Sequence, residues 1–162
     1  MQDGEDRSHG GNGHDSGHDE DGFTLEGSPA HLLHRAQQRA SDMTQQALRA
    51  VKLTPRQFAV LLALREDEGV TQSELVRRTG IDRSTLADML ARLGKRGLTH
   101  SRRTEEDQRA NAVTITAEGT RLLQTVAPKV REAEERMIAS LPDAVRGPFV
   151  AALQVLADQS RR

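Results

Sequence analysis

The chain has 162 residues, no cysteine and a formal net charge of −1, and at this length one domain with a single hydrophobic core is the simplest expectation. The lack of cysteine excludes disulfides, thiolate metal sites and thiol-based redox switches, and it is typical of a cytoplasmic protein. No apolar run is long enough to cross a bilayer, and the charged N-terminus lacks the apolar stretch of a signal peptide, so we expect no membrane partner.

The first 28 residues differ in composition from the rest. They contain eight acidic residues and one basic residue, whereas the other 134 contain 22 basic and 16 acidic residues. With frequent glycine and few apolar side chains, residues 1–28 are predicted to be a disordered acidic tail. Its histidines, His9, His14 and His18, leave a metal-responsive tail open as an alternative, but their loose spacing favours a solvated tail, so we predict no metal site and no cofactor.

A long helix is predicted over residues 29–50. Ser28 is a suitable N-cap, and Pro29 suits the first helical position, where its missing N–H has no helical partner. Apolar residues then recur on one helical face from Leu32 to Ala47.

Three shorter helices are predicted over 55–66, 72–79 and 83–95. Each is preceded by a capping residue flanked by apolar side chains, and the capping residues are Thr54, Thr71 and Asp82. Gly80 lies between the last two helices and suits the left-handed residue of a sharp turn, which predicts a helix-turn-helix.

The helix over 83–95 has one apolar and one polar face. Leu86, Met89, Leu90 and Leu93 form the apolar stripe. The opposite face carries short hydroxyls and guanidinium groups, which are able to contact base edges or phosphate; its members are Arg83, Ser84, Thr85, Asp88 and Arg92. Ser84 and Thr85 could instead support the helix N-terminus, and both roles are compatible.

A β-hairpin follows this helix. Residues 98–102 and 112–116 alternate as strands do, with Val113 and Ile115 on one face, and a polar segment joins them. A hairpin placed directly after a recognition-type helix is typical of a wing, and a plain linker has no need of the second alternating segment.

These segments resemble the MarR family of winged helix-turn-helix regulators over about residues 30–158. The resemblance is carried by Leu-Thr-Pro-Arg-Gln-Phe (53–58), Ile-Asp-Arg-Ser-Thr-Leu (81–86), and above all Asp-Gln-Arg (107–109) followed by Val-Thr-Ile-Thr (113–116). It implies that Arg109 of the wing contacts the minor groove and that Asp107 organises the wing. It also implies that Ser73 touches phosphate and that the helix over 83–95 reads the major groove of double-stranded DNA.

The resemblance further implies a homodimer. The expected fold is mainly α with a small β-hairpin wing: a winged helix-turn-helix over 53–116 and dimerisation helices over 29–50 and 117–160, within one domain over 29–162. Two apolar stripes in 117–160 exceed what a monomer core needs; a bend is expected at residues 124–128 because of Pro128, and a break at Gly147-Pro148. The target is then a pseudo-palindromic operator.

Many members of this family are repressors released by a small aromatic or anionic ligand. The resemblance implies an effector site lined from the first two helices, with four candidates, although for the last three an ordinary core position is favoured: Arg39, Met43, Phe58 and Leu62.

Catalysis is not expected, because the sequence has no phosphate-cradling glycine loop and no nucleophile–base pair at a recognisable spacing. The main alternative to DNA reading is a winged helix that serves as a protein-interaction module, in which Arg83 and Arg109 are replaceable without loss. The metal-responsive tail is the other alternative.

Overall fold

The computed structural model describes residues 24–67, 69–103 and 111–158, and it divides into two units at residues 35 and 36. In the first unit the N–H of Gly27 donates to the carbonyl of Thr24 (3.2 Å), which closes a turn before helix α1 (Pro29–Leu48) begins. The predicted tail therefore ends in a described turn, and residues 1–23 lie outside the described part of the chain.

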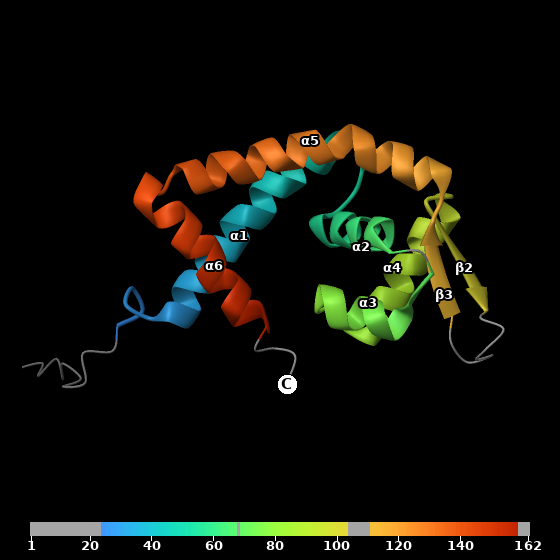
Figure 1. Ribbon diagram of the computed structural model, residues 1–162, viewed down its shortest axis with the longest axis horizontal. Coiled ribbons are helices and arrows are strands. Elements are labelled where there is room, and N and C mark those ends of the chain that lie inside the picture. Colours follow the sequence, from blue (N-terminus) through green and yellow to red (C-terminus); the bar gives the residue numbers. More distant parts are fainter. Residues whose placement is uncertain (1–23, 68, 104–110, 159–162) are drawn as a thin grey trace, which may run out of the picture. The chain divides into compact units, whose positions relative to one another are not determined.

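The second unit is mainly helical with one small antiparallel sheet (Figure 1). After α1, its elements follow in chain order: η1 (Arg49–Val51), α2 (Pro55–Glu66), β1 (Val70–Thr71), α3 (Gln72–Thr79), α4 (Arg83–Lys95), β2 (Thr99–Arg103), β3 (Asn111–Ile115), α5 (Ala117–Ala139) and α6 (Asp143–Asp158). The predicted winged helix-turn-helix fold, with terminal helices, is confirmed.

Helices α2 and α3 begin at the capping residues predicted from the sequence. Thr54 Oγ1 accepts from the N–H of Gln57 (3.2 Å), and the N–H of Thr54 donates to Gln57 Oε1 (3.0 Å), which completes a capping box at the start of α2. Thr71 Oγ1 accepts from the N–H of Glu74 (3.2 Å) at the start of α3. These bonds satisfy backbone donors that have no partner inside the helix, and so they fix where each helix begins.

The turn between α3 and α4 depends on glycine. Gly80 has a φ of 66°, in the left-handed region, and its N–H donates to the carbonyl of Val76 (2.9 Å). A residue with a Cβ is strained in this conformation, so glycine sets the angle at which α4 leaves α3.

The sheet has three strands in the order β1-β3-β2, one more than the predicted hairpin. In β2 and β3, Thr99 pairs with Ile115 and Ser101 with Val113, so the hairpin is confirmed with each strand displaced by one residue. Strand β1 was not predicted, because two residues are too few to show alternation. Strand β3 ends at Ile115 because Thr116 is the N-cap of α5.

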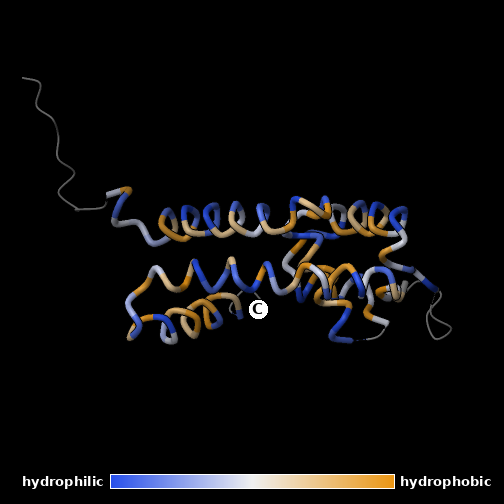
Figure 2. The backbone as a smooth tube through the Cα atoms, turned by 90° about the horizontal axis from the view of Figure 1, so that it is seen from above, coloured by the Kyte–Doolittle hydropathy of each residue, from blue (hydrophilic) through white to orange (hydrophobic). Residues whose placement is uncertain are grey.

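Apolar side chains from every helix of the winged module meet in one core. In Figure 2 the apolar residues recur at intervals along the helices, as amphipathic helices require. The predicted stripe of α4 is buried, and fully buried side chains from other elements of the core include Leu48, Leu61, Leu64, Leu75, Val113, Leu123 and Val126.

Helix α5 begins in tight contact with the base of the wing. Thr116 Oγ1 accepts from the N–H of Gly119 (3.1 Å) and donates to the carbonyl of Gly97 (2.6 Å). A Cβ on Gly119 would lie 2.3 Å from the carbonyl oxygen of Leu98, so no side chain fits there. The helix then continues through Pro128 as one element to Ala139.

Helix α6 corrects one expectation. Gly147 and Pro148 were expected to break the last helix, yet α6 begins at Asp143 and runs through both. Pro148 is the sixth residue of the helix, so its missing N–H removes one hydrogen bond near an exposed end. Arg146 holds the earlier start in place by donating to the carbonyls of Ala139 and Leu141 (both 3.0 Å).

Candidate nucleic-acid interface

Helix α4 presents polar side chains on the face opposite its buried stripe. Four of the predicted DNA-contacting side chains are exposed on it, and Thr85 is half-buried at its edge; the exposed four are Arg83, Ser84, Asp88 and Arg92. Because Leu86, Met89, Leu90 and Leu93 are buried on the other side, the core fixes the rotation of the helix about its axis. The polar side chains are thereby held toward solvent.

The N-terminus of α4 is capped by an ionised carboxylate. Asp82 Oδ1 accepts from the N–H of Thr85 (2.9 Å) and from the hydroxyl of Ser84 (2.8 Å). The backbone N–H of Thr85 is the main cause that lowers the pKa of Asp82 from its usual 3.8 to about 2, and the Ser84 hydroxyl adds to it. Asp82 therefore stays negatively charged at neutral pH.

A second contact joins α4 to α3. The Nη2 of Arg83 donates to Ser73 Oγ over 2.8 Å, and both side chains are exposed. This bond brings together two residues from separate helices that the sequence predicts to contact DNA. One guanidinium N–H is used, and the remaining donors stay available.

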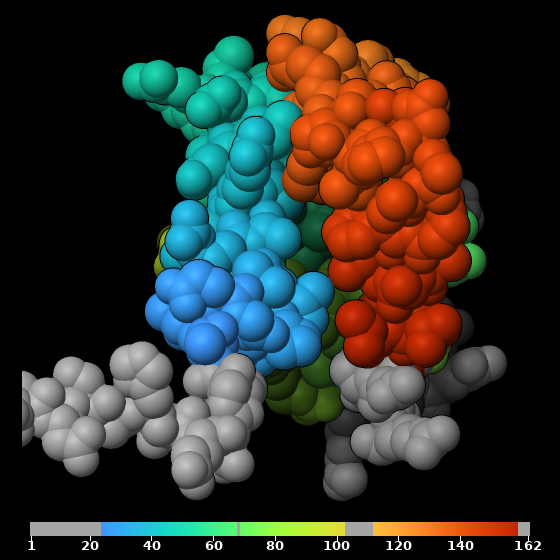
Figure 3. All heavy atoms as spheres, turned by 90° about the vertical axis from the view of Figure 1, so that its left-hand side faces the viewer, coloured from blue at the N-terminus to red at the C-terminus, as the bar shows by residue number. Residues whose placement is uncertain are grey.

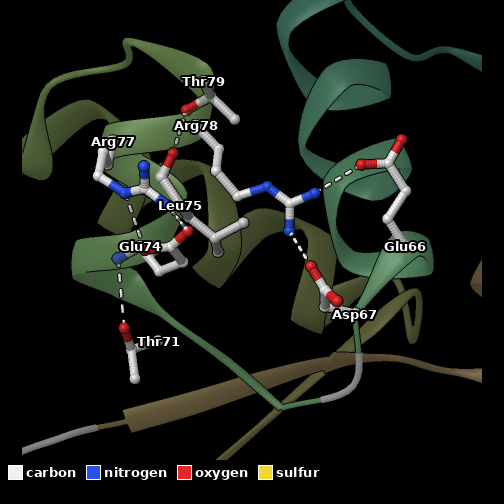
Figure 4. Close-up of polar contacts among 8 residues, drawn as sticks. All are labelled: Glu66, Asp67, Thr71, Glu74, Leu75, Arg77, Arg78 and Thr79. Carbon is white, nitrogen blue, oxygen red and sulfur yellow. Dashed lines mark hydrogen bonds and ion pairs between the residues drawn. The ribbon is translucent and has the colours of Figure 1, made fainter. Parts of the chain in front are cut away.

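Helix α3 is fastened to the end of α2 by an arginine that sequence reasoning had not singled out. The guanidinium of Arg78 donates to Glu66 (2.5 Å) and to Asp67 (2.6 Å), and its side chain is only 20% exposed (Figure 4). Arg77, on the same helix, pairs with Glu74 one turn away. The sequence did carry a signal for this contact: two adjacent acidic residues at the end of one predicted helix, and an arginine in the next.

A second overlooked arginine ties the far end of α4 to the segment between α1 and α2. Arg96 donates from Nη1 to the carbonyl of Lys52 and from Nη2 to the carbonyl of Val51, both over 2.9 Å. Lys52 has a φ of 52°, so this turn is left-handed at a residue other than glycine. Arg96 lies 44 residues from Lys52 and 45 from Val51 in the sequence, so no local pattern predicts these contacts.

The wing contributes its strands to the described structure. Arg102 is exposed on β2 opposite Ala112, and the backbone of Arg103 pairs with Asn111. Asp107 and Arg109, predicted to organise the wing and to contact the minor groove, lie outside the described residues.

The four effector candidates occupy different environments. Phe58 is buried in the core, Leu62 packs against it, and Arg39 is exposed. Met43 lines a groove of about 230 Å³ between α1 and α5. Its other lining residues are Ala40, Thr44, Ala133, Glu134, Met137 and Ile138.

A second groove, of about 430 Å³, lies between α2 and α5 and contains none of the four. It is lined by Arg65, Gln124, Ala127, Pro128, Arg131, Glu132 and Glu135.

Within residues 24–67, 69–103 and 111–158, no three histidine or acidic side chains gather as metal ligands do. His9, His14 and His18 lie outside these ranges. Among the same residues, no helix combines the length and apolar character needed to cross a membrane.

Comparison with known proteins relates the module to transcriptional regulators. The MarR family model matches residues 53–110, from the start of α2 into the wing. The HTH-type transcriptional repressor NicR of Pseudomonas putida is 32% identical over 128 residues, which cover 79% of this chain and 81% of NicR.

Solved structures share the fold over most of the chain. BpsR of Bordetella bronchiseptica, in a study of how 6-hydroxynicotinic acid regulates its DNA binding, aligns with a TM-score of 0.79 at 31% identity. The alignment covers 84% of this chain and 97% of BpsR. The repressor CouR, bound to a 23-mer DNA duplex, aligns with a TM-score of 0.77 at 30% identity, covering 82% of this chain and 94% of CouR.

Proposed function

Because this chain belongs to the MarR family and is a DNA-binding transcriptional regulator, we propose that it is a homodimeric repressor of a pseudo-palindromic operator, released by a small aromatic or anionic ligand. The exposed polar face of α4 over its buried stripe carries the DNA-reading part of this proposal. The remaining parts are supported by surfaces elsewhere in the chain and by the relatives.

The DNA contacts divide into two classes. In helix-turn-helix proteins the N-terminal residues of the recognition helix meet base edges in the major groove, which assigns base reading to Arg83, Ser84, Thr85 and Asp88. Ser73 and Arg92 are assigned to phosphate or flanking contacts. Arg109, held by Asp107, is assigned to the minor groove on the strength of the family resemblance.

Helix α6 supports the homodimer. Its surface is drawn in red in Figure 3, and large apolar side chains are exposed on several sides of the helix: Val145, Val150, Val155 and Leu156. Exposed apolar patches of this kind mark association surfaces, and a second copy of the chain is the proposed occupant. Two-fold symmetry then spaces the two recognition helices by about one DNA turn, ~34–36 Å.

An aromatic or anionic effector is supported by BpsR, whose DNA binding is regulated by 6-hydroxynicotinic acid. Arg39, Met43, Phe58 and Leu62 stay as the proposed contacts on the first two helices. Met43 faces the groove between α1 and α5, and Arg39 offers an exposed guanidinium able to pair with a carboxylate.

Selection of duplexes from a random pool by the purified full-length chain tests the proposal. We expect a motif with two related half-sites, and binding that weakens steeply as the salt concentration rises. The same selection is then repeated with hydroxylated aromatic carboxylic acids, which should lower recovery of the motif. Failure to recover any motif from random duplexes would overturn sequence-specific repression, and recovery of a single half-site would overturn the homodimer.

A further inference from the structure

We propose that Ser84 reads DNA as a hydrogen-bond acceptor, and so contacts the exocyclic amino group of its base pair, adenine N6 or cytosine N4. This inference rests on the proposed function, in which the first turn of α4 lies in the major groove. It concerns which of two possible hydrogen-bonding roles the Ser84 hydroxyl retains.

A serine hydroxyl carries one hydrogen to donate and two lone pairs that accept. The hydroxyl of Ser84 lies 2.8 Å from Asp82 Oδ1. An ionised carboxylate accepts and does not donate, so the hydrogen of this bond comes from Ser84. The lone pairs of Ser84 Oγ are what the exposed side chain has left to offer.

The cap makes this arrangement difficult to undo. The same Asp82 oxygen accepts from the N–H of Thr85 (2.9 Å), so the carboxylate is held at the helix N-terminus by the backbone. A hydroxyl that donates to a charged oxygen forms a bond stronger than one to a neutral acceptor. Turning the Ser84 hydrogen toward DNA would give up that bond.

The major-groove edge of a base pair then decides which atom Ser84 meets. Guanine presents N7 and O6, adenine N7 and thymine O4, and all of these are acceptors. Adenine N6 and cytosine N4 are the donors. An oxygen that offers lone pairs is attracted to the amino groups and repelled by the other atoms.

The next side chain on the same line of the helix reinforces this preference. Asp88 is exposed four residues after Ser84, so the two lie one above the other on α4. A carboxylate facing DNA is favourable where it accepts from an amino group, as acidic side chains do from cytosine N4. Ser84 and Asp88 thus form a row of acceptors, with Arg83 beside it as a donor.

The experiment uses the full chain and its selected motif. Selection is first run with the wild type, with Ser84→Ala, and with Ser140→Ala as a matched loss of an exposed hydroxyl away from the interface. The base pair whose preference is lost in Ser84→Ala but kept in Ser140→Ala is the one that faces residue 84.

Two duplex analogues then separate the two roles. One lacks the amino group of that pair, with purine in place of adenine or 2-pyrimidinone in place of cytosine. The other lacks the purine N7 acceptor, by 7-deaza substitution. We expect the amino deletion to weaken wild-type binding about fivefold, the scale of one neutral hydrogen bond, and the 7-deaza duplex to bind normally. Ser84→Ala should respond to neither.

The role of Asp82 is tested by Asp82→Thr, which keeps an N-cap but removes the carboxylate. Its Ser84 hydroxyl is free to donate, so the difference between the two analogues should shrink, while the thermal unfolding curve shows that the fold is retained. A 7-deaza effect larger than the amino effect in the wild type, or equal amino effects in wild type and Ser84→Ala, would overturn the inference with repression intact. A selection without any motif would overturn the proposed function itself.

Discussion

Arg83 and Ser73 are ten residues apart in the chain, and their side chains meet across 2.8 Å. The bond crosses from the first residue of α4 to the N-terminal turn of α3. It holds a long, flexible guanidinium in one orientation before binding, so less side-chain entropy is lost when DNA is engaged.

Ser73→Ala should therefore weaken operator binding about two- to tenfold, the scale of one lost hydrogen bond and a freed side chain. The thermal midpoint should stay unchanged, because both partners are exposed. Fluorescence anisotropy with the selected duplex measures the affinity. Ser140→Ala, at the end of α5 on another part of the surface, is the control; an equal loss there would refute a specific role for Ser73.

Arg78→Ala should destabilise the protein, because its guanidinium joins α3 to two carboxylates at the end of α2. Both carboxylates are exposed, so the expected loss is only about 1 kcal/mol in the free energy of unfolding. Arg78→Lys should recover part of it, since an ammonium group lacks the guanidinium fork that reaches both partners. Urea unfolding provides the measurement, with Arg77→Ala, whose ion pair stays within α3, as the comparison. Equal losses in the two alanine variants would show that the contacts of Arg78 with Glu66 and Asp67 add no stability beyond that of an ion pair within one helix.

Gly119→Ala should strongly destabilise the protein. The added Cβ would lie 2.3 Å from the backbone oxygen of Leu98 and 2.8 Å from a side-chain carbon of Ile115. Overpacking against backbone costs about 1–3 kcal/mol or more. Gly94→Ala is the matched control, because its Cβ meets nothing closer than 3.8 Å, and inside α4 it should stabilise the helix by roughly 0.5–1 kcal/mol. Calorimetric midpoints that move together in the two variants would show that the close approach is absent.

The cap of α4 should make stability depend on acid pH. The folded-state pKa of Asp82 is lowered from 3.8 to about 2, so its contribution is present above pH 4 and is lost as the pH falls from about 4 toward 2. Asp82→Asn retains a capping oxygen without the charge. The difference in urea midpoint between wild type and variant should shrink across that interval. A difference that is constant from pH 7 to pH 2 would show that charge plays no part in the cap.

A charge on the apolar surface of α6 should disrupt self-association. Leu156→Glu places a carboxylate among exposed apolar side chains, and desolvating it in an interface is costly. Sedimentation should show a dimer for the wild type and a monomer for the variant, with weaker operator binding in parallel. Gln154→Glu adds the same charge at an exposed polar position of α6 and should leave the dimer intact. A dimeric Leu156→Glu would place the subunit contact elsewhere.

Much of this fold is written in local patterns. Capping residues, a turn glycine and helical stripes depend on neighbours within a few residues, which explains why α2, α3 and α4 match their predicted bounds. Strand β1 escaped prediction because it exists through its pairing with β3, 43 residues beyond it at Val70 and Val113. Helix α6 was expected to break because Pro148 was judged without Arg146, whose bonds to the end of α5 depend on the folded turn.

In the candidate interface, too, local sequence patterns predict some features and leave others open. Helical spacing alone places Arg83, Ser84, Asp88 and Arg92 on one exposed face. That Arg83 meets Ser73, or that Ser84 donates to Asp82, is a matter of side-chain geometry that spacing leaves open. The sequence could therefore identify which residues face solvent, but the structure was needed to reveal the hydrogen-bonding role left to each.

The two bonds from Arg96 to the carbonyls of Val51 and Lys52 have a mechanical consequence. They hold the C-terminal end of α4 against the segment that connects α1 to α2. The N-terminal end of α4 is capped by Asp82. A shift of the α1–α2 connection must either move the C-terminal end of α4 with it or break both hydrogen bonds. The tilt of α4 is therefore coupled to the α1–α2 connection, which lies outside the helix face proposed to meet DNA.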